Sequence, residues 1–164
     1  MSKLAIVYYS ETNNTKAAAE AVAAKTEAKV VRVKEVGNTN PMKGMLKIAS
    51  KPVGEPDKEV ADCDRILLMS PIYAWSGIPS ILGFLKAADL SGKEVMMVTS
   101  GADPKPKTGM KVAAQYQKHI EKSGGKVTAS LYHQGGEYKK FSGEEEITKR
   151  MAPVLDQIVT WASK

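Results

Sequence analysis

Three short segments of the sequence combine residue types that could bind a ligand. The first, residues 10–15, reads SETNNT and follows a run of apolar residues. Its hydroxyl and amide side chains, together with the free backbone N–H groups at the start of a helix, form a cradle for a phosphate. An ordinary helix cap needs only one such residue, so the excess favours a phosphate site. The residues that we predict to hold the phosphate are Ser10, Thr12, Asn13, Asn14 and Thr15.

The charge of this segment distinguishes it from other phosphate loops. It contains no Lys or Arg, and Lys16 directly follows it. We therefore expect hydrogen-bond donors, rather than cations, to balance the phosphate. The segment lacks both the Gly-Lys-Ser/Thr ending of a Walker loop and the glycine pattern of a dinucleotide-binding fold.

The second segment, residues 70–77, reads SPIYAWSG and concentrates aromatic side chains. Aromatic residues make up only 6% of the chain, yet Tyr73 and Trp75 are two positions apart. A flat heterocycle stacks on such side chains, and offset stacking contributes about 0.5–1.5 kcal/mol per pair beyond burial. The alternative is that both aromatics only cover the helix that follows. The residues that we predict to contact a ring are Pro71, Ile72, Tyr73, Ala74, Trp75, Ser76 and Gly77.

The third segment, residues 99–104, reads TSGADP and consists mainly of small residues. Small side chains leave room for a ring, and the backbone N–H groups can reach its polar edge. The same composition is also typical of a plain turn. The predicted contacts are Thr99, Ser100, Gly101 and Asp103.

Alternating strands and helices are expected to position these segments. Apolar or alternating runs predict strands at residues 3–9, 29–34, 65–69, 93–99 and 126–132. Helices are expected at residues 14–25, around 42–50, after 79, at 108–123 and from 142 onward, where Ser142 and Glu145 fit a capping box. Five strands alternating with helices predict one α/β domain over residues 1–164, with a doubly wound parallel sheet. Ligands of such sheets bind beyond the carboxyl ends of the strands, where all three segments lie.

Composition narrows the function classes further. The 24 Lys and Arg residues against 18 Asp and Glu residues give a net charge of +6, but the basic residues are scattered, so neither nucleic acid nor a membrane is an expected partner. No apolar run approaches the ~20 residues of a membrane-spanning helix. The single cysteine, Cys63, excludes an internal disulfide and a multi-cysteine metal site. We expect a cytoplasmic protein without a metal site.

Two motifs resemble the flavodoxin family. YYSETNNT at residues 8–15 resembles its phosphate loop, and SPIYAWSGIPSILGFL at residues 70–85 resembles its aromatic loop and following helix. The resemblance implies a five-stranded parallel sheet in the order 2-1-3-4-5, non-covalently bound FMN and single-electron transfer. It assigns the phosphate to Ser10, Thr12, Asn14 and Thr15, the isoalloxazine ring to Tyr73 and Trp75, and further flavin contacts to residues 99–103.

The chain departs from the family pattern in two respects. Asn13 stands where the family usually has glycine, and Asn tolerates a positive φ better than most residues. Flavodoxins are usually acidic, whereas this chain has a net charge of +6, which implies acidic redox partners such as ferredoxin-like proteins. Two other functions fit the same fold. One is an NAD(P)H-dependent quinone or flavin reductase, with Lys105 and Lys107 attracting a nicotinamide phosphate. The other is a binding module without flavin.

Overall fold

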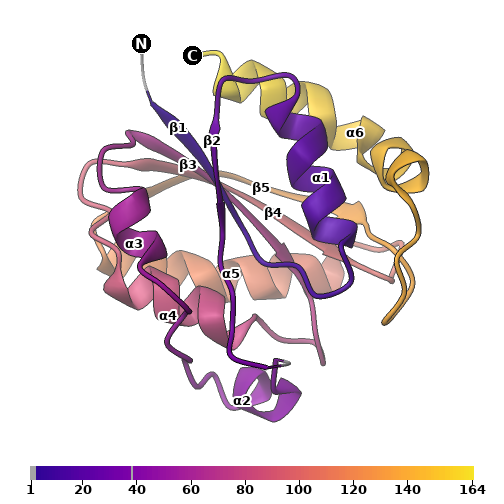
Figure 1. Ribbon diagram of the computed structural model, residues 1–164, viewed down its shortest axis with the longest axis horizontal. Coiled ribbons are helices and arrows are strands. Elements are labelled where there is room, and N and C mark those ends of the chain that lie inside the picture. The colour runs from indigo at the N-terminus through magenta and orange to yellow at the C-terminus, as the bar shows by residue number, and fades with distance from the viewer. Residues whose placement is uncertain (1–2, 38) are drawn as a thin grey trace.

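The computed structural model describes residues 3–37 and 39–164, and a parallel β-sheet forms its centre (Figure 1). The strands are β1 (Leu4–Tyr8), β2 (Lys29–Arg32), β3 (Arg65–Pro71), β4 (Glu94–Gly101) and β5 (Lys126–Gln134). They pair in the order β2-β1-β3-β4-β5, and every pair is parallel. The predicted fold class and strand order are therefore confirmed.

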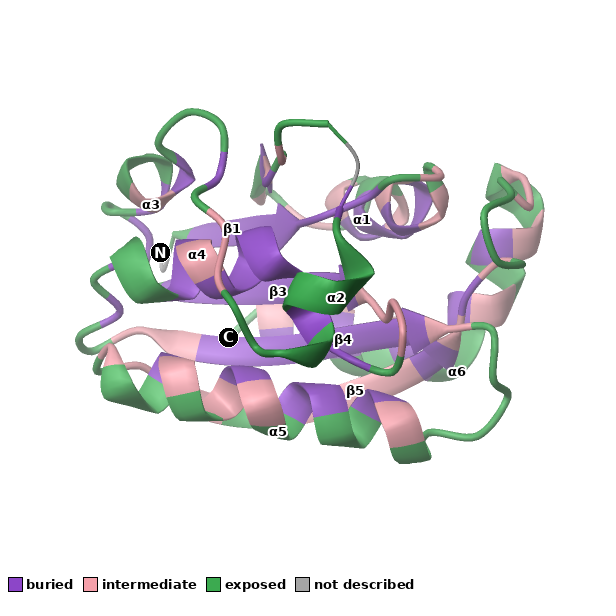
Figure 2. Cartoon of the chain, turned by 90° about the horizontal axis from the view of Figure 1, so that it is seen from below, coloured by how far each residue is buried: buried purple, intermediate pink, exposed green. Residues whose placement is uncertain are grey.

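Helices cover both faces of this sheet. One face packs against α1 (Asn14–Ala23) and α6 (Glu144–Ala162), and the other packs against α4 (Pro79–Ala87) and α5 (Lys107–Lys122). The central strands consequently lie between two layers of helices, as Figure 2 shows by the buried colour along β1, β3 and β4. No helix among residues 3–37 and 39–164 is long and apolar enough to cross a membrane.

Side-chain alternation along the strands explains the two cores. In β1, Ala5 and Val7 belong to the core beneath α4 and α5, whereas Leu4 and Ile6 belong to the core beneath α1 and α6. Because successive side chains of a strand point to opposite faces, a strand buried on both sides must be apolar throughout. The continuous apolar run at the start of the sequence is therefore central, as predicted.

The connections differ more from the expectation than the strands do. The helix expected at residues 42–50 is the shorter α2 (Pro41–Met45), because the backbone turns left-handed at Lys47, where φ is +57°. A short helix, α3 (Pro56–Glu59), was not predicted.

The predicted capping box at the start of the last helix is wrong. Gly143, with a φ of +92°, precedes the first turn of α6, and no side chain caps that end. The Ser142 hydroxyl instead accepts a hydrogen bond from the Glu137 N–H at 3.2 Å. Ser142 therefore shapes the connection before α6 rather than the helix itself.

Candidate ligand-binding site

The three segments singled out in the sequence meet at the carboxyl edge of the sheet. Together they line a cavity of about 890 Å³, to which Thr12, Tyr73 and Gly101 each contribute from a different loop. A smaller cavity of about 90 Å³ shares those three residues and reaches the start of α1. The two cavities therefore adjoin.

Buried hydroxyl groups line the smaller cavity. Ser10, Thr15 and Ser100 are only 6%, 5% and 6% exposed, and all three belong to its wall. The Ser10 hydroxyl accepts a hydrogen bond from the Lys16 N–H at 3.2 Å. Within the described residues, the Thr15 hydroxyl has no hydrogen-bond partner, so it is available to a ligand.

The backbone at the start of α1 offers further donors. Asn13 precedes the helix in the left-handed conformation, with a φ of +67°, and its side chain makes no capping hydrogen bond. Across residues 3–37 and 39–164, no protein acceptor is bonded to the backbone N–H groups of residues 12–15. Since a helix N-terminus carries partial positive charge, these groups suit an anion.

The Asn14 side chain is bonded to three other groups of the protein. Its side-chain amide donates hydrogen bonds to the Thr12 hydroxyl at 3.0 Å and to the Lys140 carbonyl at 2.7 Å. Its carbonyl oxygen accepts from the Ser142 N–H at 2.9 Å. The side chain therefore lines the small cavity, but its hydrogen bonds are made within the protein.

The aromatic segment forms a tight turn at the mouth of the larger cavity. Tyr73 and Ser76 exchange two backbone hydrogen bonds, of 3.3 Å and 3.0 Å. Between them, Ala74 and Trp75 both have positive φ, +48° and +57°, as in a type I′ turn, which normally contains Asn-Gly. A left-handed conformation costs a residue with a side chain about 1–2 kcal/mol. This strained turn presents Trp75, which is 75% exposed, at the cavity.

The other aromatic residue of this turn is packed and uncharged. The Tyr73 ring meets the Tyr9 ring edge to face, with 6.4 Å between their centroids. Burial, and then the Glu11 carboxylate, raise the pKa of Tyr9 to about 12 and raise the pKa of Tyr73 as well. Both phenols therefore stay protonated at physiological pH and can donate hydrogen bonds.

Tyr116 of α5 supports this segment from below. Its hydroxyl lies 2.8 Å from the Ser70 hydroxyl and accepts a hydrogen bond from the Ile78 N–H at 2.7 Å. A Cβ atom at Gly77 would lie 2.7 Å from its ring. The glycine is therefore needed for packing onto Tyr116.

Most predicted site residues line one cavity or the other, and a few do not. Those outside both are Asn13, Ser76, Gly77 and Thr99. Asn13 sets the turn before α1, and Ser76 donates to the Gly44 carbonyl. Thr99 is 1% exposed beneath α5, where Gly109 passes close to its hydroxyl.

Sequence reasoning missed the connection between β5 and α6, which lines both cavities. Tyr138 and Lys139 belong to both walls. One signal in the sequence could have indicated this connection. It is the Gly135-Gly136 pair that directly follows the last strand, with the aromatic Tyr138 two positions later. Other lining residues that were not predicted are Glu11, Thr39, Pro41, Thr108, Tyr132 and Glu137.

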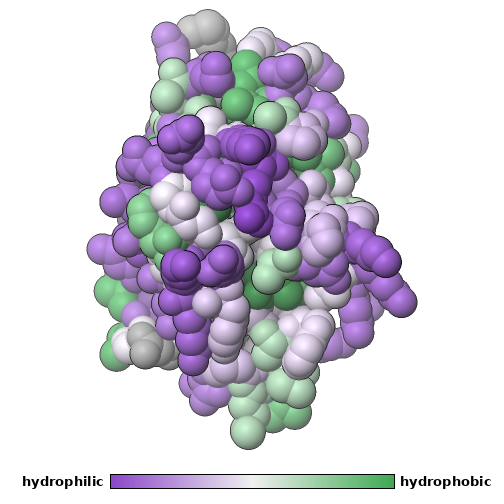
Figure 3. Space-filling model, turned by 90° about the vertical axis from the view of Figure 1, so that its right-hand side faces the viewer, coloured by the Kyte–Doolittle hydropathy of each residue, from purple (hydrophilic) through white to green (hydrophobic). Residues whose placement is uncertain are grey.

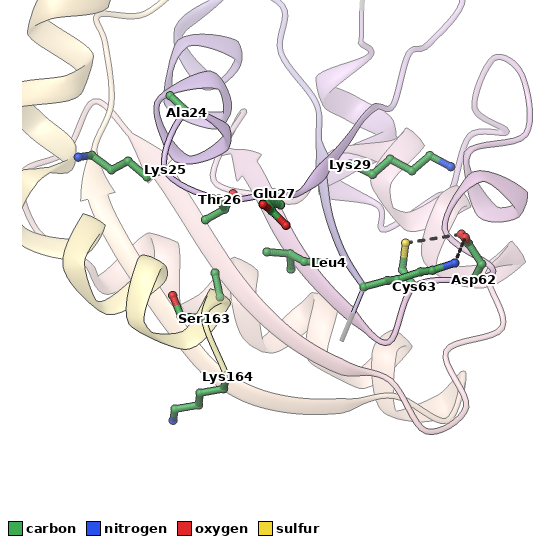
Figure 4. A pocket seen from close by; sticks show the side chains of 12 residues that line it. Leu4, Ala24, Lys25, Thr26, Glu27, Lys29, Asp62, Cys63, Ser163 and Lys164 are labelled. Atoms are coloured by element: carbon green, nitrogen blue, oxygen red, sulfur yellow. Dashed lines mark hydrogen bonds and ion pairs between the residues drawn. The ribbon is translucent and has the colours of Figure 1, made fainter. Parts of the chain in front are cut away.

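Another cavity, of about 790 Å³, lies at the opposite edge of the sheet, near the ends of α1 and α6 (Figure 4). Figure 4 shows that the ammonium groups of Lys25, Lys29 and Lys164 point in different directions rather than toward a common centre. Lysines near helix C-termini interact favourably with the helix dipole. Their placement therefore has a structural explanation, and none of the predicted site residues lies there.

The sequence matches no model of a known protein family and resembles no curated protein. Solved structures do resemble the fold. A flavodoxin of Streptococcus pneumoniae TIGR4 is 18% identical with a TM-score of 0.62, covering 98% of this chain and 97% of that one. Flavodoxin 2 from Bacillus cereus is 18% identical with a TM-score of 0.62, covering 96% and 98%. A flavoprotein in complex with FMN from Lactobacillus acidophilus NCFM is 17% identical with a TM-score of 0.62, covering 92% and 99%. The chain has the flavodoxin-like fold.

Proposed function

We propose that this protein binds FMN non-covalently and carries electrons in the manner of a flavodoxin. The observation that carries the proposal is the pair of adjoining cavities. The polar one, of about 90 Å³, lies at the start of α1 and has the size of a phosphate, and the larger one, of about 890 Å³, has aromatic walls. FMN joins a phosphate to a flat isoalloxazine through a flexible ribityl chain, so its two ends match the two cavities.

Each part of the site has a role in this proposal. The hydroxyls of Ser10 and Thr15 and the N–H groups at the start of α1 bind the phosphate. Tyr73 and Trp75 contact the ring, and the small residues around Gly101 leave space for it. The bound flavin supplies the redox chemistry, while the protein orients it and sets its electrostatic environment.

The surface beside the larger cavity supports an acidic protein as the redox partner. Residues 36–53 contain Lys43, Lys47 and Lys51 but no Asp or Glu. In α2, Met42 and Met45 are 67% and 60% exposed. Figure 3 shows hydrophobic side chains gathered at the lower end of this side of the molecule, at the level of α2 in Figure 1. A basic, partly apolar surface of this kind favours encounter with an acidic partner.

The test is titration of the purified protein with FMN, followed by its visible spectrum and flavin fluorescence. We expect a shifted spectrum and changed fluorescence that saturate at one FMN per chain. An unchanged spectrum together with unchanged fluorescence would refute FMN binding and favour the flavin-free binding module.

Anaerobic addition of NADPH to the FMN-loaded protein distinguishes an electron carrier from an NAD(P)H-dependent reductase. A carrier is reduced slowly by NADPH alone and needs a partner protein. Rapid bleaching of the flavin by NADPH, without any other protein, would instead identify an NAD(P)H-dependent reductase.

A further inference from the structure

We infer that the connection between β5 and α6, residues 135–143, is part of the cofactor site: Lys139 supplies the cation for the phosphate, Tyr138 supplies an additional aromatic wall, and Asn14 positions both. This inference rests on the proposed binding of FMN and extends it to residues that the phosphate-loop motif does not include.

The first part of this connection is anchored to the edge of the sheet. The Gly135 N–H donates to the Gly101 carbonyl at 2.8 Å. The Arg150 guanidinium of α6 donates to the Gly135 carbonyl at 2.7 Å, and its Nε also bonds to Glu146 at 2.7 Å. The connection therefore leaves β5 from a fixed point beside the loop that follows β4.

The second part is anchored to the start of α1 through a single side chain. Asn14 donates to the Lys140 carbonyl and accepts from the Ser142 N–H, at 2.7 Å and 2.9 Å. Gly136 packs closely against the Asn14 side chain, because a Cβ atom at this glycine would lie only 2.4 Å from the Asn14 amide nitrogen. Asn14 thus joins the phosphate loop to the connection through these two hydrogen bonds.

Between these anchors, the tip of the connection reaches the ligand cavities. Tyr138 and Lys139 line both of them. Lys139 has a φ of +56°, a left-handed conformation that a lysine adopts only at a cost. Its Nζ lies 5.3 Å from the centre of the Tyr138 ring. The two side chains therefore lie against each other where they line the cavities.

The charges of this tip favour an anion next to Lys139. Glu137 also lines the small cavity, but its carboxylate is paired with Lys140 at 3.2 Å. Within the described part of the chain, Lys139 pairs with no carboxylate. A phosphate in the small cavity would meet an unpaired ammonium, although the phosphate loop itself has no cation. Hydrogen bonds with a charged partner are about twice as strong as neutral ones.

The experiment compares the binding of FMN and riboflavin, which differ only in the phosphate, by fluorescence titration at low and high salt. We expect Lys139→Met to weaken FMN binding about tenfold, to leave riboflavin binding unchanged and to reduce the effect of salt on FMN binding. Lys111→Met is the matched control, because Lys111 of α5 is exposed and lines neither cavity. It removes the same charge and should change neither affinity.

A double-mutant cycle tests the positioning role of Asn14. Asn14→Ala alone should weaken FMN binding, and it should weaken it less in the Lys139→Met background, because only its effect on Tyr138 then remains. Fully additive effects would refute the positioning role. If FMN binds to the wild-type protein and Lys139→Met behaves like Lys111→Met, the inference fails while the proposed function stands. If the wild-type protein binds no FMN, both fail.

Discussion

The Asn14 side-chain amide donates a hydrogen bond to the Lys140 backbone carbonyl at 2.7 Å, although 126 positions separate the two residues. Gly136 lies against the same amide, and a Cβ atom there would overlap it at 2.4 Å. Gly136→Ala should therefore displace Asn14 and destabilise the protein by about 1–3 kcal/mol, the range for overpacking a well-packed site. Urea denaturation measures the change. Gly101→Ala is the control, because the nearest atom to its added Cβ lies at 3.4 Å, and it should be close to neutral. Equal stability of the two variants would show that the packing around Asn14 can relax.

The backbone at Asn13 gives a second prediction. Its φ of +67° lies in the left-handed region, which Gly and Asn tolerate best. Asn13→Gly should preserve the stability of the protein, whereas Asn13→Ala should lower the free energy of unfolding by about 1 kcal/mol. Because the Asn13 side chain makes no capping hydrogen bond, the loss in the alanine variant would report the backbone alone. An alanine variant as stable as the wild type would show that the turn before α1 is not strained.

Substitutions in the turn at Ala74 and Trp75 should have opposite effects on the stability of the protein and on its affinity for FMN. Both residues adopt positive φ where a type I′ turn prefers Asn-Gly. The double substitution Ala74→Asn, Trp75→Gly should therefore raise the melting temperature, since it relieves strain of about 1 kcal/mol or more. It also removes the exposed indole from the mouth of the larger cavity, so FMN should bind more weakly. Calorimetry and FMN titration of the same variant check both effects.

The single substitution Ala74→Asn serves as its control. It relieves part of the strain and keeps Trp75, so it should raise stability without weakening FMN binding. If both variants bind FMN as tightly as the wild type, Trp75 has no role in holding the ring.

A structural feature of this protein can be predicted from the sequence when the residues that determine it lie close together along the chain. The strand at residues 4–8 and the polar loop after it are contiguous in sequence, and their residue types alone identify them. The role of Asn14 is different, because its partners Lys140 and Ser142 lie at the other end of the chain. No local pattern distinguishes an amide that binds a phosphate from one that holds a distant loop.

Long-range contacts also explain why the predicted capping box is wrong and why Lys139 was not predicted. Ser142 and Glu145 have the correct spacing, but the long-range contact with Asn14 fixes the backbone before α6 in another conformation. Lys139 lines the small cavity because the connection that carries it leaves β5 next to β4. Sequence reasoning identified residues that line the cavities from single loops, and it missed residues that line them from the connection after β5.

His133 predicts how stability depends on pH. It is 5% exposed, and burial, aided by the nearby Arg150 guanidinium, lowers its pKa below 6.5. Below pH 6.5 the unfolded chain takes up a proton that the folded protein does not, so stability should fall as the pH drops toward 5. Above pH 6.5 this histidine is neutral in both the folded and the unfolded chain, so it contributes nothing to the change of stability with pH.

Urea denaturation between pH 5 and 7.5 measures this effect, with at most about 1.4 kcal/mol per pH unit from one histidine. His133→Gln should flatten the fall below pH 6.5. His119 is less buried, and its pKa is lowered by burial and by Lys86 and Lys122, so His119→Gln should flatten it less. A slope that His133→Gln leaves unchanged would mean that His133 is protonated in the folded state as well.

Glu11 should influence the redox potential of bound FMN. Its carboxylate lines the larger cavity and is close enough to Tyr73 to raise the pKa of that phenol. A fixed negative charge beside the ring disfavours electron uptake, so Glu11→Gln should make the midpoint potential more positive. An interaction of about 1 kcal/mol corresponds to a shift on the order of 20 mV for two electrons. Asp156→Asn on α6 removes the same charge away from both cavities and should leave the potential unchanged. Equal potentials for wild type and Glu11→Gln would mean that solvent screens this carboxylate from the flavin.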